Sequence, residues 1–150
     1  MKVSRVFTNG IIIFLGIGIL FLIMDFLNLT HLYYLRVLNV FIVIYGVNRT
    51  IKMNQADGVR GYLTNFIAAV TTSMIGAILS VASLLAYIEY RGGEAYLKII
   101  SKGFLFGGGE LSIYQYCIGL LFESVAASMI ISFCLMQYWK DKVEVINKVN

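Results

Sequence analysis

The chain has 150 residues, of which 59% are apolar and only 13% are charged, and its formal net charge is +4. Its apolar residues fall in long runs, and such a composition excludes an ordinary water-soluble globular protein. We therefore expect an integral membrane protein with the lipid bilayer as its surroundings. Anionic lipid at the cytoplasmic surface explains the basic excess without nucleic acid as a partner.

Four segments are predicted to cross the membrane, because a bilayer core of about 30 Å requires roughly 20 mostly apolar residues of helix. They are expected at residues 6–27, 32–47, 62–87 and 112–138. The first is longer than the apolar stretch of a signal peptide and lacks a small-x-small cleavage site. The short link at 28–31 predicts an antiparallel hairpin of the first two helices. The fold class is thus all-α: a polytopic, antiparallel bundle of four transmembrane helices in one domain.

Two longer links join the remaining helices. The link at 48–61 is polar and rich in turn-forming residues, and the link at 89–111 contains a stretch with amphipathic spacing. In that stretch apolar and charged residues occupy opposite faces: Tyr96, Leu97, Ile99 and Ile100 against Glu94, Lys98 and Lys102. We predict a short helix that lies at the membrane interface.

Basic residues near the ends of the predicted helices indicate the orientation, because Lys and Arg are retained on the cytoplasmic side. With the N-terminus inside, the inner set is Lys2, Arg5, Arg49, Lys52, Arg60, Lys140, Lys142 and Lys148. The outer set is Arg36, Arg91, Lys98 and Lys102. The larger inner set predicts that both termini are cytoplasmic and that the second link lies outside.

Residue counts argue against common enzymatic sites. His31 is the single histidine, so a histidine-based metal or haem site within one chain is not expected. Cys117 and Cys134 are about 25 Å apart along one helix, too far to form a disulfide. The serines have no histidine at membrane depth to act as a base. We expect no catalytic residues, no metal ion and no cofactor.

Glu123 is the outstanding polar residue, because it lies about 16 Å into the fourth predicted helix, near the membrane midplane. One interpretation is a neutral carboxyl that hydrogen-bonds across to another helix, where Thr71 and Thr72 reach a similar depth. The other is a proton or cation site in a transport path. We favour the structural interpretation, since no second acidic residue occurs at that depth.

Asp25 and Arg36 form a second candidate pair, at the outer ends of the first and second predicted helices. The simpler hypothesis is an ion pair that closes the hairpin, with Arg36 extending toward the interface. The alternative places Arg36 in a polar cavity with Asn39 and Glu123. We favour the ion pair.

Small residues recur every four positions on the last two predicted helices. They are Thr72, Gly76 and Ser80 on the third, and Ser124, Ser128 and Ser132 on the fourth. Such stripes let helix backbones approach closely in lipid. We predict that the two stripes face each other.

The layout also carries a family resemblance. A tight first hairpin, the turn Asp57-Gly58-Val59-Arg60-Gly61-Tyr62 before the third helix, and a long outer link before the fourth are similar to a family of small bacterial four-helix membrane proteins of unassigned function. The resemblance implies a bacterial inner membrane and assigns no residue roles.

Two functional hypotheses follow. In the first, the protein is non-catalytic and acts by helix packing, as a subunit or accessory component of a membrane complex or as a homo-oligomer. In the second, it is a small oligomeric channel or carrier that uses Glu123 for proton or cation passage. We favour the first, because its supporting features cover more residues.

Overall fold

The computed structural model describes residues 2–101 and 111–143 of the chain, and this part of the chain is almost entirely helical. The helices are α1 (Val3–Phe26), a 3-10 helix η1 (Tyr33–Val37), α2 (Leu38–Ala56), α3 (Tyr62–Tyr90), α4 (Glu94–Ile100) and α5 (Ile113–Val143). The predicted all-α class is confirmed. The first, third and fourth predicted helices are found with ends shifted by at most five residues.

Three of these helices, α1, α3 and α5, are long and apolar enough to cross a membrane. The helix α2 does not meet that criterion, and it differs from the prediction of a helix at 32–47. The 3-10 helix η1 directly precedes α2. The helix α2 then continues to Ala56 through the polar residues that were expected to form a link. Those residues are helical because α2 buries Thr50 and Asn54 against its neighbours, where the helix satisfies the backbone.

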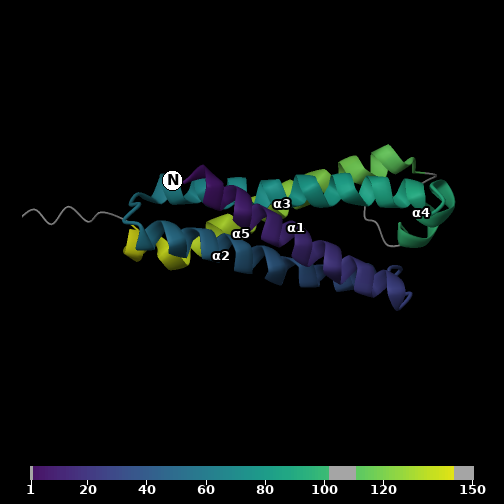
Figure 1. Ribbon diagram of the computed structural model, residues 1–150, viewed down its shortest axis with the longest axis horizontal. Helices are drawn as coiled ribbons and strands as arrows, with labels where there is room; N and C mark the ends of the chain where they lie inside the picture. Colours follow the sequence, from purple (N-terminus) through teal and green to yellow (C-terminus); the bar gives the residue numbers. More distant parts are fainter. Residues whose placement is uncertain (1, 102–110, 144–150) are drawn as a thin grey trace, which may run out of the picture.

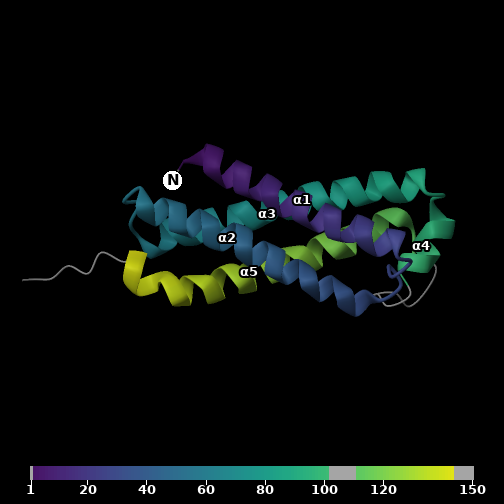
Figure 2. The same ribbon diagram turned by 60° about the horizontal axis from the view of Figure 1, so that its bottom comes forward.

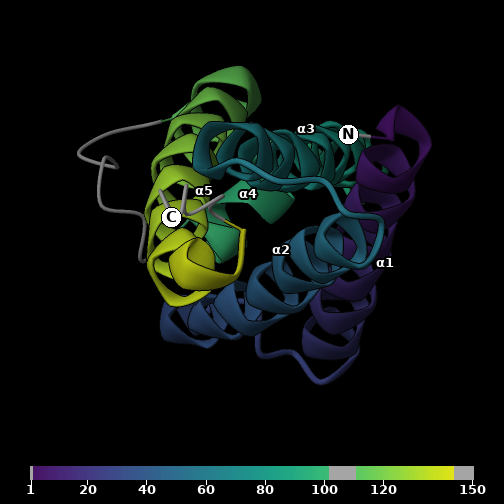
Figure 3. The same ribbon diagram turned by 90° about the vertical axis from the view of Figure 1, so that its left-hand side faces the viewer.

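The long helices alternate in direction (Figures 1 and 2). The N-terminus, the turn between α2 and α3, and the end of α5 lie together at one end of the molecule, which we call the terminal end. The turn between α1 and α2 lies with α4 at the other, which we call the α4 end. Seen along its length, α2 and α3 lie between α1 and α5 (Figure 3), and both contact each of these outer helices.

Ile13 of α1 is the centre of the closest helix packing. It is fully buried, and it fits between two glycines on other helices. A Cβ atom added to Gly46 of α2 would lie 2.4 Å from its Cγ1, and one added to Gly76 of α3 would lie 2.6 Å from its Cγ2. Gly10 is equally tight against Ile75, at 2.6 Å. Glycine is therefore required where α1, α2 and α3 meet, because any side chain would collide.

This packing corrects the predicted pairing of small-residue stripes. Thr72 and Gly76 do not face α5, because they pack against α1 and α2 at the Ile13 junction. On α5, Ser128 and Ser132 are buried, and Ser124 is half-buried with its hydroxyl donating to the carbonyl of Leu120 at 2.7 Å. Spacing of four residues identified buried positions on both helices, but for Thr72 and Gly76 it did not identify the helices that cover them.

Two apolar clusters form the core, one toward each end. The cluster at the terminal end joins α1, α2, α3 and α5 through Ile13, Val47, Ile51, Ala69, Met136, Trp139 and Val143. The cluster at the α4 end contains Ile88, Tyr96, Leu97, Ile100, Ile113, Tyr116 and Cys117. The predicted short helix is thus confirmed as α4, and its Tyr96, Leu97 and Ile100 pack on the bundle whereas Ile99 is exposed.

Candidate functional site

At the α4 end, the carboxylate of Asp25 is the centre of a group that we call the Asp25 cluster. The hydroxyl of Tyr96 donates to its Oδ1 at 2.6 Å, and the hydroxyl of Tyr87 donates to its Oδ2 at 2.6 Å. Arg91 donates to Oδ2 at 3.0 Å, and its guanidinium lies over both rings, 5.9 and 5.6 Å from their centroids. Short bonds to a charged acceptor are the strong ones, so this cluster fastens α1, α3 and α4 together.

Tyr96 is held as a hydrogen-bond donor by its surroundings. Burial, followed by its bond to Asp25, raises the pKa of the Tyr96 hydroxyl above its ordinary value of 10.0. The phenol therefore keeps its proton and donates throughout the physiological range.

The predicted ion pair between Asp25 and Arg36 is wrong, because Asp25 pairs with Arg91. Arg36 lies on η1, where it donates to the carbonyl of Ile100 at 3.0 Å and to the hydroxyl of Tyr116. The turn between α1 and α2 points the two side chains to different neighbours, and both end on residues around α4. Asn39, one turn further along, is half-buried and takes no part in these bonds.

Toward the terminal end, buried polar side chains connect α1, α2 and α3 in what we call the polar ladder. The amide of Asn9 donates to the hydroxyl of Thr50 at 2.9 Å, and this hydroxyl lies 3.1 Å from that of Thr72. One turn closer to the end, the side-chain amide of Asn54 donates to the side-chain oxygen Oδ1 of Asn65 at 3.2 Å. All five residues are buried, so each bond satisfies a group that would otherwise be costly.

The terminal end itself is tied by charged and polar contacts. Arg5 and Lys2 bind the carboxylate of Asp57 at 2.6 and 3.1 Å, and Arg5 also donates to the carbonyl of Met53 at 2.9 Å. Hydrogen bonds from Arg5 and then Lys2 hold the pKa of Asp57 below its usual 3.8. On the opposite side, the indole of Trp139 donates to Asn48 at 2.7 Å.

Glu123 lies on the exposed surface of α5, ten positions after the helix begins at Ile113. Within the described part of the chain, its carboxyl makes no hydrogen bond or ion pair. The expected bond to Thr71 or Thr72 is absent from these residues, because both hydroxyls donate within their own helix. Thr71 bonds the carbonyl of Ile67 and Thr72 that of Ala68, at 2.8 and 2.7 Å. Among the described residues, Arg36 bonds to Ile100 and Tyr116, and it makes no hydrogen bond or ion pair with Asn39 or Glu123.

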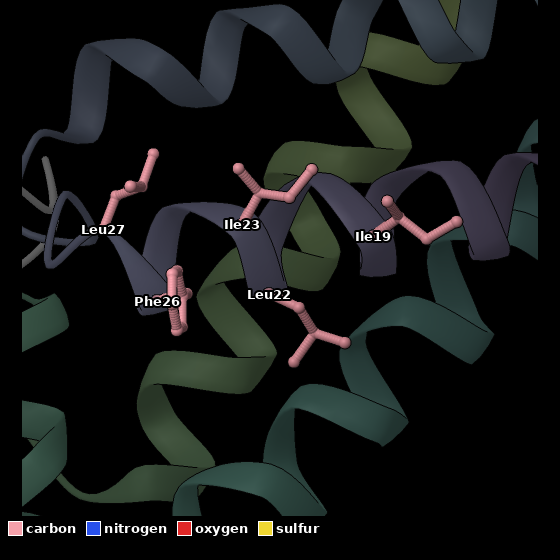
Figure 4. Close-up of a pocket in the computed structure, with 5 residues that line it drawn as sticks. All are labelled: Ile19, Leu22, Ile23, Phe26 and Leu27. Atoms are coloured by element: carbon pink, nitrogen blue, oxygen red, sulfur yellow. The ribbon is translucent and has the colours of Figure 1, made fainter.

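An apolar groove of about 450 Å³ runs along the outside of α1 near the α4 end. Figure 4 shows that its lining side chains come from this one helix. They are Ile19, Leu22, Ile23, Phe26 and Leu27, and each is at least half exposed. A surface of this kind suits contact with lipid chains, since it has no polar group to orient a solute.

Sequence reasoning missed the polar ladder and the part played by Tyr96. Asn9 and Asn65 stand inside or beside long apolar runs, where a polar side chain needs a partner, and Thr50 and Asn54 share one helix face. That signal was present in the sequence. Which asparagine meets which hydroxyl depends on helix packing, which the sequence pattern does not contain.

In both the polar ladder and the Asp25 cluster, polar side chains hydrogen-bond to other side chains of the same group. These bonds connect helices far apart in sequence. Comparison of the chain with models of protein families, with curated proteins and with solved structures gave no match.

Proposed function

We propose that this protein is a non-catalytic integral membrane protein that acts by helix packing, as a homo-oligomer or as a subunit or accessory component of a membrane complex. The observation that carries the proposal is the distribution of its polar groups. The side chains of the polar ladder bind each other, whereas Glu123 stands on the outer face of α5 among exposed apolar side chains such as Phe122 and Ile130. A rigid bundle with such a face is suited to assembly with other chains.

The proposal includes four transmembrane helices with both termini in the cytoplasm of a bacterial cell. Its support for α2 is geometric: 19 helical residues span about 28 Å and the preceding 3-10 helix adds about 10 Å. Contacts with α1, α3 and α5 bury Thr50 and Asn54 of α2, so a lower hydropathy is tolerated. The basic residues at the terminal end support its cytoplasmic side, and the inner-membrane setting rests on the family resemblance.

The test is to extract the protein from the cell membrane directly into lipid nanodiscs, without a detergent step. The mass and the protein composition of the resulting particles are then measured. We expect particles that contain more than one protein chain, either several copies of this chain or this chain with others in fixed ratio. Particles that hold a single copy and no other protein, at every expression level, would remove the proposal.

The second candidate is a small channel or carrier in which Glu123 passes protons or cations. The observation that favours it is the exposed position of Glu123, ten positions into a helix long enough to cross a membrane, on a surface where a path would run between copies. Glu123→Gln keeps the shape of the side chain but removes its charge. A proton or cation flux in vesicles that is lost in this variant, while the protein still folds, would place the transport function above the packing function.

A further inference from the structure

One face of α5 combines an acidic residue with small side chains, and we call it the Glu123 face. Positions separated by three or four residues on a helix share a side, which groups Gly119, Glu123, Ala126, Ile130 and Cys134. All of them are exposed except Gly119, which is half-exposed. Only 17% of the apolar part of α5 is buried, compared with 33% for α3, so α5 has the larger surface available for a partner.

The position of Glu123 requires that something covers this face. The residue lies ten positions after the start of α5, about 15 Å along a helix that is long enough to cross the membrane. A glutamate side chain is too short to reach water from that depth, and an unpartnered carboxyl in hydrocarbon is strongly disfavoured. No residue of the described ranges hydrogen-bonds to it, so the bundle does not supply the partner.

We propose that the partner is a second copy of this chain, with the two Glu123 carboxyls hydrogen-bonded to each other across a two-fold axis. Such an axis along the membrane normal places identical residues at the same depth, as in most dimers. In such a pair the hydroxyl of one carboxyl group donates to the carbonyl oxygen of the other. Gly119 and Ala126 lie one turn to either side, where small side chains let the two backbones approach closely enough for short acids to meet.

Arg36 of the same chain does not serve as the partner of Glu123. A dimer needs no basic residue at that depth, and the arginine that sequence reasoning placed near Glu123 is engaged elsewhere: Arg36 binds Ile100 and Tyr116. The inference rests on the proposed function and names its partner, a copy of the same chain docked through α5.

Cys134 offers a direct test, because this free and exposed thiol lies three turns from Glu123 on the same face. The full chain would be reconstituted in vesicles of phosphatidylethanolamine and phosphatidylglycerol and treated with copper phenanthroline. We expect a disulfide-linked dimer. The matched control is Cys134→Ala combined with Met129→Cys, which moves an exposed thiol to another side of α5, and there we expect a monomer.

Variants of the face then test the carboxyl pair, with the dimer constant measured by energy transfer between labelled copies. Glu123→Leu should weaken dimerisation by about tenfold, whereas Glu123→Gln, which keeps a donor and an acceptor, should retain most of it. Ala126→Leu changes a side chain exposed in the monomer. It should also weaken the dimer, and it provides a test if Glu123→Leu fails to fold.

Three results would overturn the inference: equal cross-linking of the Met129→Cys control, unchanged dimerisation of Glu123→Leu or Ala126→Leu, or no cross-linking through Cys134. If the chain assembles but not through this face, the inference fails and the proposed function stands. If it is monomeric in vesicles and no other chain accompanies it from the cell, both fail.

Discussion

Replacing Gly76 with alanine is expected to destabilise the bundle, although alanine is the better helix former. The added Cβ would lie 2.6 Å from Cγ2 and 2.8 Å from Cβ of Ile13, and 3.2 Å from the carbonyl oxygen of Gly10. The Ile13 side chain cannot move away from the new methyl group, because its Cγ1 branch already packs closely against Gly46 on α2. One of the three helices must therefore move.

The magnitude follows from two opposing effects. Overpacking a close contact costs about 1 to 3 kcal/mol, and exchanging glycine for alanine inside a helix returns up to about 1 kcal/mol. The net loss is about 1 to 2 kcal/mol, which for a chain of this size lowers the melting temperature by about 2 to 4 °C per kcal/mol.

The matched control is Gly18→Ala on α1. No atom lies within 4 Å of a Cβ built at Gly18, so this variant should be neutral or slightly stabilised. A second change, Ile13→Ala in the Gly76→Ala background, removes the side chain that blocks the new methyl group. The double variant should be more stable than the sum of the single effects predicts.

The assay is thermal unfolding of the purified protein in one detergent, followed by circular dichroism and by tryptophan fluorescence. The reasoning is refuted if Gly76→Ala melts at the same temperature as Gly18→Ala, or if the two changes at Gly76 and Ile13 are simply additive. Either result would show that the three helices do not meet as closely as the glycine contacts indicate.

Three further predictions concern topology and the two ends of the bundle. Single cysteines would be introduced at exposed Ala56 or exposed Ala95 in a chain whose Cys134 is replaced by alanine. A thiol reagent that does not cross the membrane should label the cysteine at 56 only from the cytoplasmic side and the cysteine at 95 only from outside. Labelling of both from one side would contradict four transmembrane helices. Tyr96→Phe removes a hydrogen bond to the Asp25 carboxylate that is worth about 1.5 kcal/mol at this partly open site. Backbone amide hydrogens of α4 should therefore exchange with solvent about tenfold faster. An unchanged exchange rate would show that apolar packing alone holds α4. Because the folded pKa of Asp57 is lowered from 3.8, its contribution to stability is present above about pH 4 and is lost as the pH falls through the lower folded value. Melting between pH 6 and pH 3 should therefore shift more for the parent than for Asp57→Asn, and equal shifts would exclude this carboxylate.

The helical class and the positions of most helices were determined by the sequence alone, because long apolar runs have few solutions other than a membrane helix. The short helix α4 was likewise visible in the spacing of residues 94–100. Sequence reasoning also identified Asp25, Arg36 and Glu123 as the side chains in need of explanation. For each of them the cause is local: a polar or charged group on a helix that is otherwise apolar.

Partners were decided by the tertiary structure. Asp25 binds Arg91 and two tyrosines because α4 folds back over the bundle end, and no pattern within the chain specifies that contact. The stripe around Gly76 meets α1, because helix periodicity defines a buried face but not the neighbour that covers it. The length of α2 was misjudged for the same reason. Its polar residues look like a link when read alone, and they are helical because neighbouring helices bury Thr50 and Asn54.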